Sequence, residues 1–358
     1  MLFEPATLRA LPLSNRIVMS PMTRSRAVDN GLPNALMAEY YAQRATAGLI
    51  ITEGVAPSPN GRGYARIPGI YNDAQTQAWR GVTDAVHARG GRIVVQLMHT
   101  GRVGHRANLP EGAEVLGPVD GACPGEIWTD AEGMQPHTAA RAMTDDDIAQ
   151  AVDAFVHAAT LAMQAGFDGV ELHGANGYLI EQFLNANVNT RTDAYGGDMH
   201  ARNRFALDVV RATVAAIGAD KVGIRLSPYS NALGTGSFPE VDAQYLALMA
   251  ELSALGLLYV HVLDHSSLGT PPLPAGFLQT LRAAFDGPFI LAGGHTLDTA
   301  QAAVDAGHAD LVAFGRPFIS NPDLVERFRT GAALNAPDFA TFYTPGANGY
   351  TDYPTLTA

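Results

Sequence analysis

Cysteine and lysine are almost missing from this chain of 358 residues. Cys123 is the single cysteine, so the chain cannot form an intramolecular disulfide framework or a cysteine-ligated zinc or iron–sulfur centre. Lys221 is the only lysine among 23 basic residues, and 35 acidic residues bring the net charge to −12. This acidic balance argues against nucleic acid and anionic membranes as partners.

Long apolar runs and targeting signals are absent as well. No run of roughly 18 uninterrupted apolar residues occurs, so no transmembrane helix is expected. Residues 1–5 include no charged segment followed by an apolar one, which argues against a signal peptide. With 47% hydrophobic and 16% charged residues, the composition is that of a globular protein. We expect a cytoplasmic enzyme, either a monomer or a homodimer.

Short β-branched apolar runs alternate with longer alanine-rich stretches of helical periodicity. This pattern predicts a (β/α)8 TIM barrel forming a single domain over residues 1–358. A doubly wound open sheet is the alternative, but no Gly-x-Gly-x-x-Gly follows the first strand. The expected strands are Ile17–Ser20, Leu49–Glu53, Arg92–Leu97, Gly169–Leu172, Val222–Leu226, Leu258–Val262, Phe289–Ala292 and Leu311–Phe314. The clearest helices are Asp145–Ala165, Arg202–Ile217, Asp242–Leu255 and Asp298–Ala306.

Three regions depart from the strand–helix repeat. Residues 1–16 have a Leu/Pro pattern that we interpret as a hairpin closing the bottom of the barrel. Residues 100–143 form an insertion after the third strand, rich in Gly and Pro, which we expect to lie over the site as a structureless lid. The tail, residues 336–358, is rich in aromatic side chains and is expected to return over the barrel mouth.

The most informative segment is Glu171-Leu-His-Gly-Ala-Asn-Gly-Tyr-Leu179, at the end of the fourth expected strand. It brings together an imidazole (His173), a carboxamide (Asn176) and a phenol (Tyr178). If the chain turns helical after the strand, His173 and Asn176 share one face, because they are three residues apart. Two such hydrogen-bond donors beside a weak acid can hold an oxyanion and deliver a proton to the adjacent carbon.

Other strand ends indicate a phosphate site. Gly293 and Gly294 follow the seventh strand, and Gly315 with Arg316 follows the eighth, where barrel enzymes commonly bind phosphate. The phosphate can belong to a substrate or to a cofactor. Gln96 and Arg225 favour a cofactor, because an amide opposite a fixed cation suits the pyrimidine edge of a flavin.

The same residues allow two alternative interpretations. A flavin-free, phosphate-binding barrel enzyme is the alternative function, but it needs a Lys or Glu base at the barrel mouth, and Lys221 starts a strand at the opposite end. His261, Asp264 and His265 have metal-like spacing, as do His99 and His105. No supporting cluster accompanies either set, so no metal site is expected.

Several motifs in order resemble the old yellow enzyme family of FMN-dependent ene-reductases, particularly the N-ethylmaleimide and pentaerythritol tetranitrate reductase branch. The resemblance covers essentially the whole chain, from Leu2 to Pro354. Its motifs include Asn15-Arg-Ile-Val, Ser20-Pro-Met-Thr-Arg-Ser-Arg26, Glu171-Leu-His-Gly-Ala-Asn-Gly-Tyr-Leu179, Asn189-Thr-Arg-Thr-Asp-Ala-Tyr-Gly-Gly197, Val222-Gly-Ile-Arg-Leu-Ser-Pro228 and Phe314-Gly-Arg-Pro-Phe.

The resemblance implies roles for named positions. Thr23 would bind the flavin C4=O, Gln96 and Arg225 the pyrimidine edge, and His173 with Asn176 the substrate oxygen, while Tyr178 would protonate Cα. Tyr64 and Tyr350 would face the substrate. The backbone at Pro21, Met22 and Gly54 would line the flavin ring, and Gly293, Gly294, Gly315 and Arg316 would bind its phosphate. Met98 stands where the family branch usually has tryptophan, which should widen the substrate pocket.

The activity implied by the resemblance is NAD(P)H-dependent reduction of activated alkenes. The expected substrates are α,β-unsaturated carbonyl compounds, maleimides and nitroalkenes, and FMN is the expected cofactor. NAD(P)H and the alkene would use the same site in turn, in a ping-pong cycle.

Overall fold

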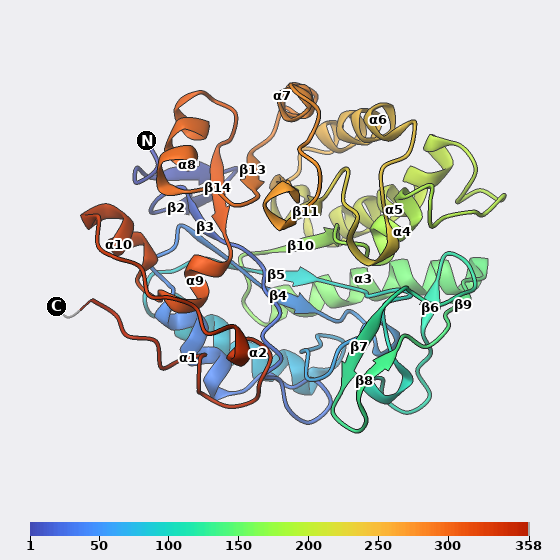
Figure 1. Ribbon diagram of the computed structural model, residues 1–358, viewed down its shortest axis with the longest axis horizontal. Coiled ribbons are helices and arrows are strands. Elements are labelled where there is room, and N and C mark those ends of the chain that lie inside the picture. The colour runs from blue at the N-terminus through green and yellow to red at the C-terminus, as the bar shows by residue number, and fades with distance from the viewer. Residues whose placement is uncertain (357–358) are drawn as a thin grey trace.

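Eight parallel strands, hydrogen-bonded in chain order, close into a barrel in the computed structural model, which describes residues 1–356 (Figure 1). The barrel closes where Val312 of the last strand lies opposite Ile17 of the first. The predicted TIM barrel is confirmed, and every strand lies within two residues of its expected bounds. The strands are β3 (Ile17–Met19), β4 (Leu49–Val55), β5 (Ile93–Leu97), β10 (Gly169–Gly174), β11 (Val222–Leu226), β12 (Tyr259–Leu263), β13 (Phe289–Ala292) and β14 (Leu311–Phe314).

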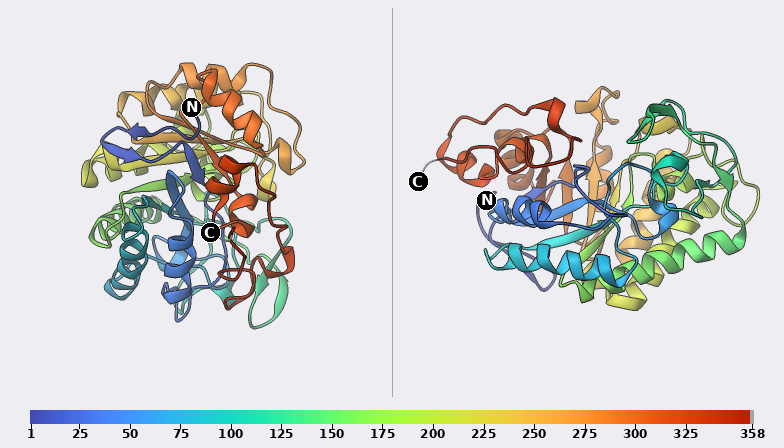
Figure 2. Two further views of the ribbon diagram at one scale, coloured as in Figure 1. Left: turned by 90° about the vertical axis from the view of Figure 1, so that its left-hand side faces the viewer. Right: turned by 90° about the horizontal axis from the view of Figure 1, so that it is seen from below.

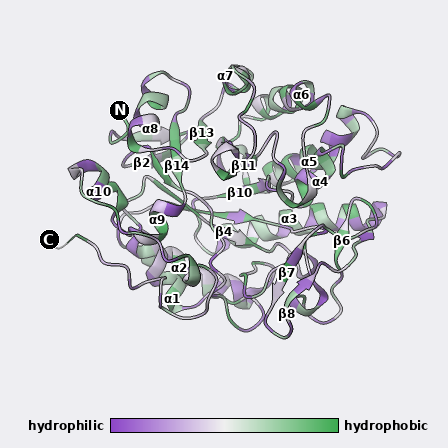
Figure 3. Cartoon of the chain, in the orientation of Figure 1, coloured by the Kyte–Doolittle hydropathy of each residue, from purple (hydrophilic) through white to green (hydrophobic). Residues whose placement is uncertain are grey.

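Helices surround the barrel on its outer side (Figures 1 and 2). The outer helices carry both hydrophobic and hydrophilic residues, as expected when one face packs on the strands (Figure 3). The four expected helices are confirmed within three residues of their predicted bounds. The helices are α1 (Ala35–Gln43), α2 (Asp73–His87), α3 (Asp145–Gln164), α4 (Leu179–Leu184), α5 (Met199–Ile217), α6 (Val241–Ala254), α7 (Phe277–Ala283), α8 (Leu297–Asp305), α9 (Arg316–Ser320) and α10 (Leu324–Thr330).

The N-terminal segment is a hairpin that closes the bottom of the barrel, as predicted. Strands β1 (Ala6–Leu8) and β2 (Leu11–Leu13) pair antiparallel. Leu8 and Leu13 are buried in one cluster with Leu49 and Leu311, which begin strands β4 and β14. The amino-terminal ends of parallel strands meet at the barrel bottom, so the opposite end is left for chemistry.

The insertion after β5 is folded, and the expectation of a structureless segment was wrong. Strands β7 (Glu126–Thr129) and β8 (Gly133–Pro136) form an antiparallel hairpin, while β6 (Leu116–Gly117) pairs with β9 (Arg141–Ala142). The Thr129 hydroxyl closes the hairpin turn, because it accepts from the Glu132 backbone N–H at 3.0 Å and donates to the Gly133 carbonyl at 3.0 Å. The opening and closing of this segment as a lid stays a prediction.

The C-terminal tail returns to the barrel mouth and is anchored there by two buried arginines that follow β3. Arg24 Nη2 donates to the Gly349 carbonyl at 2.7 Å, and Arg26 Nη1 donates to the Phe342 carbonyl at 2.6 Å. Charge-assisted hydrogen bonds of this kind are stronger than neutral ones. The tail is therefore part of the site wall.

None of the helices within residues 1–356 is long and apolar enough to span a membrane.

Truncating the hairpin core should destabilise the fold selectively. Leu13→Ala removes a buried side chain and should lower the free energy of unfolding by about 2–5 kcal/mol. Leu11→Ala truncates a partly buried side chain that packs against the same cluster and should cost clearly less than Leu13→Ala. Urea denaturation of both variants measures the difference; equal losses would contradict the closing role of the hairpin.

Candidate active site

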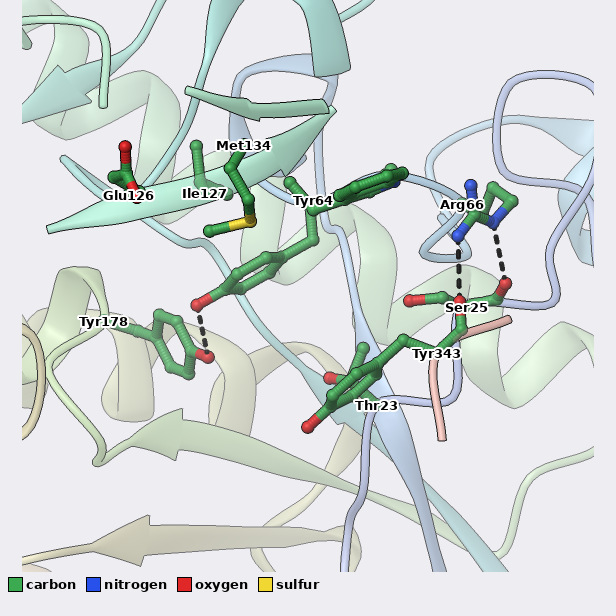
Figure 4. Close-up of a pocket in the computed structure, with 11 residues that line it drawn as sticks. Thr23, Ser25, Tyr64, Arg66, Glu126, Ile127, Met134, Tyr178 and Tyr343 are labelled. Atoms are coloured by element: carbon green, nitrogen blue, oxygen red, sulfur yellow. Dashed lines mark hydrogen bonds between the residues drawn. The ribbon is translucent and has the colours of Figure 1, made fainter. Parts of the chain in front are cut away.

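Two cavities lie where the carboxyl ends of the barrel strands meet. The larger, about 340 Å³, is lined by the loop after β3, the β7–β8 hairpin and the tail, and includes Thr23, Tyr64, Tyr178 and Tyr343 (Figure 4). The smaller, about 280 Å³, is lined by Arg225, the Gly293–Gly294 turn, Gly315 and Arg316. The strand ends thus supply both a pocket with several aromatic side chains and a cationic pocket.

His173 lies near the end of β10, and a tight turn, not a helix, places Asn176 and Tyr178 after it. The strand continues to Gly174, Asn176 and Gly177 take left-handed φ values of 60° and 80°, and α4 begins only at Leu179. The expectation that His173 and Asn176 share a helical face is therefore wrong. A Cβ on Gly177 would come within 2.7 Å of the Ala232 carbonyl oxygen, so the turn requires glycine there.

Asn176 is held at both its backbone and its side chain. Its N–H donates to the Ser227 hydroxyl at 2.8 Å, and His265 Nε2 lies 2.9 Å from its Oδ1. Burial and nearby Arg225 lower the pKa of His265 to about 4, so the imidazole is neutral near pH 7. A neutral ring with its proton on Nε2 donates to Oδ1, which leaves the Asn176 amide NH2 free to donate elsewhere.

A buried carboxyl group supports the same turn from behind. Glu181 Oε2 accepts from the Gly177 N–H at 2.6 Å and from the Ser227 hydroxyl at 3.0 Å. Burial raises the pKa of Glu181 to about 8, against the opposing effect of these two donors. Residues from α4 and from the end of β11 thus fix the backbone that carries Asn176.

His173 is a buried, neutral imidazole with one free ring nitrogen. Burial, and after it Arg225, hold its pKa well below the ordinary value. Its Nδ1 has no hydrogen-bond partner among the described residues, and its ring lies 5.0 Å from that of Tyr178 in an edge-on arrangement. A buried nitrogen without a partner is uncommon in folded proteins and indicates a position meant for another group.

Tyr178 and Tyr64 form a hydroxyl pair in the wall of the larger pocket (Figure 4). Their oxygens are 3.1 Å apart and their rings are perpendicular. Burial raises the pKa of Tyr178 to about 12, although the Tyr64 hydrogen bond acts in the opposite direction. Tyr178 therefore keeps its proton at neutral pH.

A fully buried carboxylate, Glu171, organises the barrel interior two residues before His173. Gln96 Nε2 donates to its Oε1 at 2.8 Å, and His261 Nδ1 lies 2.9 Å from its Oε2. Burial alone would raise the pKa of Glu171, but His261, Arg225 and the Gln96 amide together hold it below its ordinary value. Because a carboxylate only accepts, Gln96 must turn its NH2 to Glu171, and its Oε1 is left to accept from another group.

The smaller cavity suits an anion. Arg225 and Arg316 line it, and no carboxylate occurs among its described lining residues. Gly293 and Gly294 have φ values of 139° and 73°, and a Cβ on Gly293 would come within 2.6 Å of the Asp264 carbonyl oxygen. Arg225 is 5% exposed and its Nε has no partner among residues 1–356. The two arginines and the glycine turn therefore suit a phosphate group that lies beside the polar edge of a cofactor ring.

The remaining residues expected near a flavin come from the loop after β3 and from β4. Pro21, Met22 and Thr23 follow β3, and the Met22 sulfur is 3.6 Å from where a Cβ on Gly315 would stand. A Cβ on Gly54 would come within 2.5 Å of the Met98 sulfur. Met98 is thus buried against Gly54 and does not line the larger pocket, so its expected substrate contact is not seen.

The expectation that Tyr350 faces the substrate was wrong. Tyr350 is fully buried and stacks on Tyr40, with ring centroids 4.1 Å apart. Arg24 and Arg26 lie over its ring and fix it below the surface. The tail aromatic that lines the pocket is Tyr343, 61% exposed.

The histidines with metal-like spacing have other partners. His261 bonds Glu171 and His265 bonds Asn176, while His99 and His105 each accept from a backbone N–H group. No group of three or more possible metal ligands occurs among residues 1–356. Sequence reasoning missed Glu171, His265 and Tyr343 as site residues. The alternation of β10 carried a signal for Glu171, since residues two apart on a strand face the same side.

Comparisons with known proteins agree over nearly the full length. A sequence model of the NADH:flavin oxidoreductase / NADH oxidase family matches residues 1–335. 12-oxophytodienoate reductase 7 of Oryza sativa subsp. japonica is 43% identical, over 99% of this chain and 94% of that protein. Chanoclavine-I aldehyde reductase of Penicillium roqueforti is 44% identical, over 98% and 95%.

Solved structures are similar to the same extent. Morphinone reductase superposes with a TM-score of 0.95 and 45% identity, covering 99% of this chain and 96% of that one. An old yellow enzyme homologue from Zymomonas mobilis gives 0.94 and 40%, covering 99% of both chains. One structure of morphinone reductase is a complex with tetrahydroNAD.

Proposed function

This chain belongs to the NADH:flavin oxidoreductase / NADH oxidase family and to its old yellow enzyme branch, and we propose on that premise that it reduces activated C=C bonds. The proposed substrates are α,β-unsaturated carbonyl compounds, maleimides and nitroalkenes. The family match also removes the flavin-free barrel enzyme as an alternative.

The cofactor is FMN, with NAD(P)H as the reductant. We propose that Arg316 and the turns at Gly293, Gly294 and Gly315 hold its phosphate, with Gln96 and Arg225 at the pyrimidine edge. Thr23, Pro21, Met22 and Gly54 would border the ring. Bound there, FMN would supply the chemistry of hydride transfer from NAD(P)H to the alkene, and the two reactants would use the same site in turn.

The residues of the chain act on the substrate's oxygen and on a proton. The Asn176 amide NH2 and His173 bind the carbonyl or nitro oxygen, which draws electron density from the alkene. The Tyr178 hydroxyl donates its proton to Cα, and its own oxygen is left hydrogen-bonded to Tyr64. Tyr64 would face the substrate beside it.

One observation carries this proposal: a protonated phenol stands beside an imidazole nitrogen that has no protein partner. His173 is buried, and its ring lies edge-on against the partly buried Tyr178, which lines a pocket whose walls are mostly apolar. Hydrogen-bond donors in such surroundings act more strongly on developing charge than they do in water.

An anaerobic absorbance titration tests the proposed function. Flavin bands at about 460 nm should bleach with NADPH and return with 2-cyclohexenone. Bands that bleach without returning would contradict the choice of substrate. A protein that is colourless and takes up no FMN would contradict the cofactor as well.

Removing the phenol should affect only one half-reaction. Tyr178→Phe should slow reoxidation by 2-cyclohexenone by about 10²–10⁴, because the proton donor is lost. Flavin reduction by NADPH needs no such proton and should stay nearly unchanged. Stopped-flow absorbance on each half-reaction gives both rates; an unaltered oxidative rate would exclude Tyr178 from this role.

The oxidative half-reaction should also be insensitive to pH over a wide range. With its pKa raised to about 12 by burial, Tyr178 stays protonated and its donor capacity is lost only as pH rises through that value. The rate constant should therefore be flat from about pH 6 to pH 10. A fall centred near pH 10 would show that the phenol titrates as an ordinary tyrosine.

The glycine turn after β13 should be essential for retaining FMN. Gly294→Ala puts a Cβ 2.4 Å from the Ser267 Cβ at a φ of 73° and should raise the FMN dissociation constant at least about tenfold. Gly276→Ala is the matched control, since its φ is 80° but its Cβ would meet nothing within 4 Å. Fluorescence titration of both apoproteins with FMN measures the two dissociation constants. Equal FMN affinities of the two variants would contradict the assignment of Gly294 to the phosphate site.

His265 should act by orienting Asn176. His265→Ala frees the amide to rotate and should lower kcat/KM for 2-cyclohexenone about fivefold, the equivalent of one hydrogen bond. His265→Gln retains a donor at a similar reach and should restore most of the loss. Steady-state kinetics with 2-cyclohexenone gives kcat/KM for both variants. An equal loss in the two would show that His265 acts through packing and not through its hydrogen bond to Asn176.

A further inference from the structure

Exposed apolar side chains gather at the mouth of the larger pocket. Trp128 and Met134 are each 52% exposed and Tyr343 is 61% exposed, and all three line this one pocket. They are three of the nine large hydrophobic side chains exposed within residues 1–356. Exposed apolar side chains that gather in one place often mark a ligand-binding groove, whereas single exposed apolar residues are common on any protein surface. We call these three residues the apolar shelf.

The hairpin holds two members of the apolar shelf side by side. Trp128 of β7 lies directly opposite Met134 of β8 in the antiparallel register, so both side chains project from the same face. Figure 4 shows Met134 reaching from the hairpin toward Tyr64. The shelf is therefore continuous with the pocket that contains Tyr178.

The shelf is fixed in place by Arg66. The guanidinium pairs with Asp130, donates to the Tyr343 carbonyl at 2.8 Å and donates to the Ser25 carbonyl at 3.2 Å. Trp128 Nε1 also donates to Asp130 at 3.0 Å. One arginine thus ties the hairpin, the tail and the loop after β3 together, so the shelf needs little further ordering to receive a ligand.

The charges around the shelf exclude an anionic ligand group. Arg66 is the one cation in the described lining, and its nitrogens are already engaged by Asp130 and two carbonyls. Glu126 adds a negative charge at the rim. A part of a ligand that lies on the shelf would contact aromatic rings, the Met134 thioether and the Glu126 carboxylate. These surroundings favour an uncharged apolar group.

We propose that the preferred substrates are neutral activated alkenes carrying an extended apolar group, which packs on Trp128, Met134 and Tyr343. This inference rests on the proposed function, because the oxygen at the other end of the molecule must be bound by His173 and Asn176. A compact substrate such as 2-cyclohexenone would contact His173 and Asn176 without reaching the apolar shelf.

A chain-length series tests the proposal. For wild-type enzyme, kcat/KM should rise from crotonaldehyde through 2-hexenal to 2-decenal, by up to about fourfold for each methylene that reaches the shelf. The double variant Trp128→Ala, Met134→Ala should flatten this rise while leaving kcat/KM for 2-cyclohexenone within about twofold. Leu334→Ala, which removes an exposed apolar side chain outside the pocket lining, is the matched control and should keep the full rise. A flat series in the wild type, or a rise that survives the double variant, would overturn the proposal.

A binding measurement separates the shelf from the chemistry. The chain has two tryptophans, and Trp79 is fully buried, so a ligand on the shelf should change the emission of Trp128 alone. Titration of the holoenzyme with 2-undecanone, which has no reducible alkene, should blue-shift this emission, and Trp128→Phe should abolish the response. The corresponding ω-carboxylate should bind at least about tenfold more weakly, because its charge would be desolvated beside Glu126.

The two failures are distinguishable by this pair of measurements. If no alkene reoxidises the flavin while 2-undecanone still shifts the emission, the proposed function fails and the shelf stands as a binding surface. If 2-cyclohexenone is reduced but 2-undecanone leaves the emission unchanged, the shelf is overturned and the function stands.

Discussion

A carboxylate with no exposed surface, Glu171, is the constraint on which the polar centre of the barrel depends. A charge in that position is tolerated only when it is paired and hydrogen-bonded, and Gln96, His261 and Arg225 provide those interactions. Because Glu171 can only accept, it takes the NH2 of the Gln96 amide and leaves the amide oxygen for the proposed cofactor site. It also balances the buried cation of Arg225. Of the two residues proposed to hold the pyrimidine edge of FMN, Gln96 is therefore oriented by Glu171, and the charge of Arg225 is balanced by it.

The site divides its work between rigid strands and strained turns. Strands β5 and β11 supply Gln96 and Arg225, which are proposed to hold the pyrimidine edge, and β10 lies between them and fixes their spacing. Of the groups proposed to face the substrate, His173 lies near the end of β10, while Asn176 comes from the turn after it. The left-handed backbone at Asn176 is maintained by Ser227, Glu181 and His265. Backbone strain of this kind persists only where the surrounding structure compensates for it. The compensating contacts come from three separate elements, which makes the turn well defined.

Local patterns predicted the barrel, because a buried parallel strand is a continuous apolar run that can be read within six residues. They also placed His173 and Tyr178 near one another. The predictions from sequence were wrong where contacts between residues far apart in the chain determine the structure. Asn176 depends on His265, 89 residues away, and the hairpin at residues 126–136 is specified by backbone pairing with little hydrophobic signal. Tyr343 and Tyr350 are similar in sequence context, and only the packing of Tyr350 against Tyr40 separates the pocket residue from the buried one.

The central claim is that the buried charge of Glu171 sets the environment of the flavin. Potentiometric titration of the bound flavin in Glu171→Gln, which keeps the side-chain size and removes the charge, tests this most directly. With Arg225 no longer balanced and Gln96 free to turn, the midpoint potential should rise and FMN should bind more weakly than in the wild type. A potential and an FMN affinity equal to those of the wild type would contradict the claim.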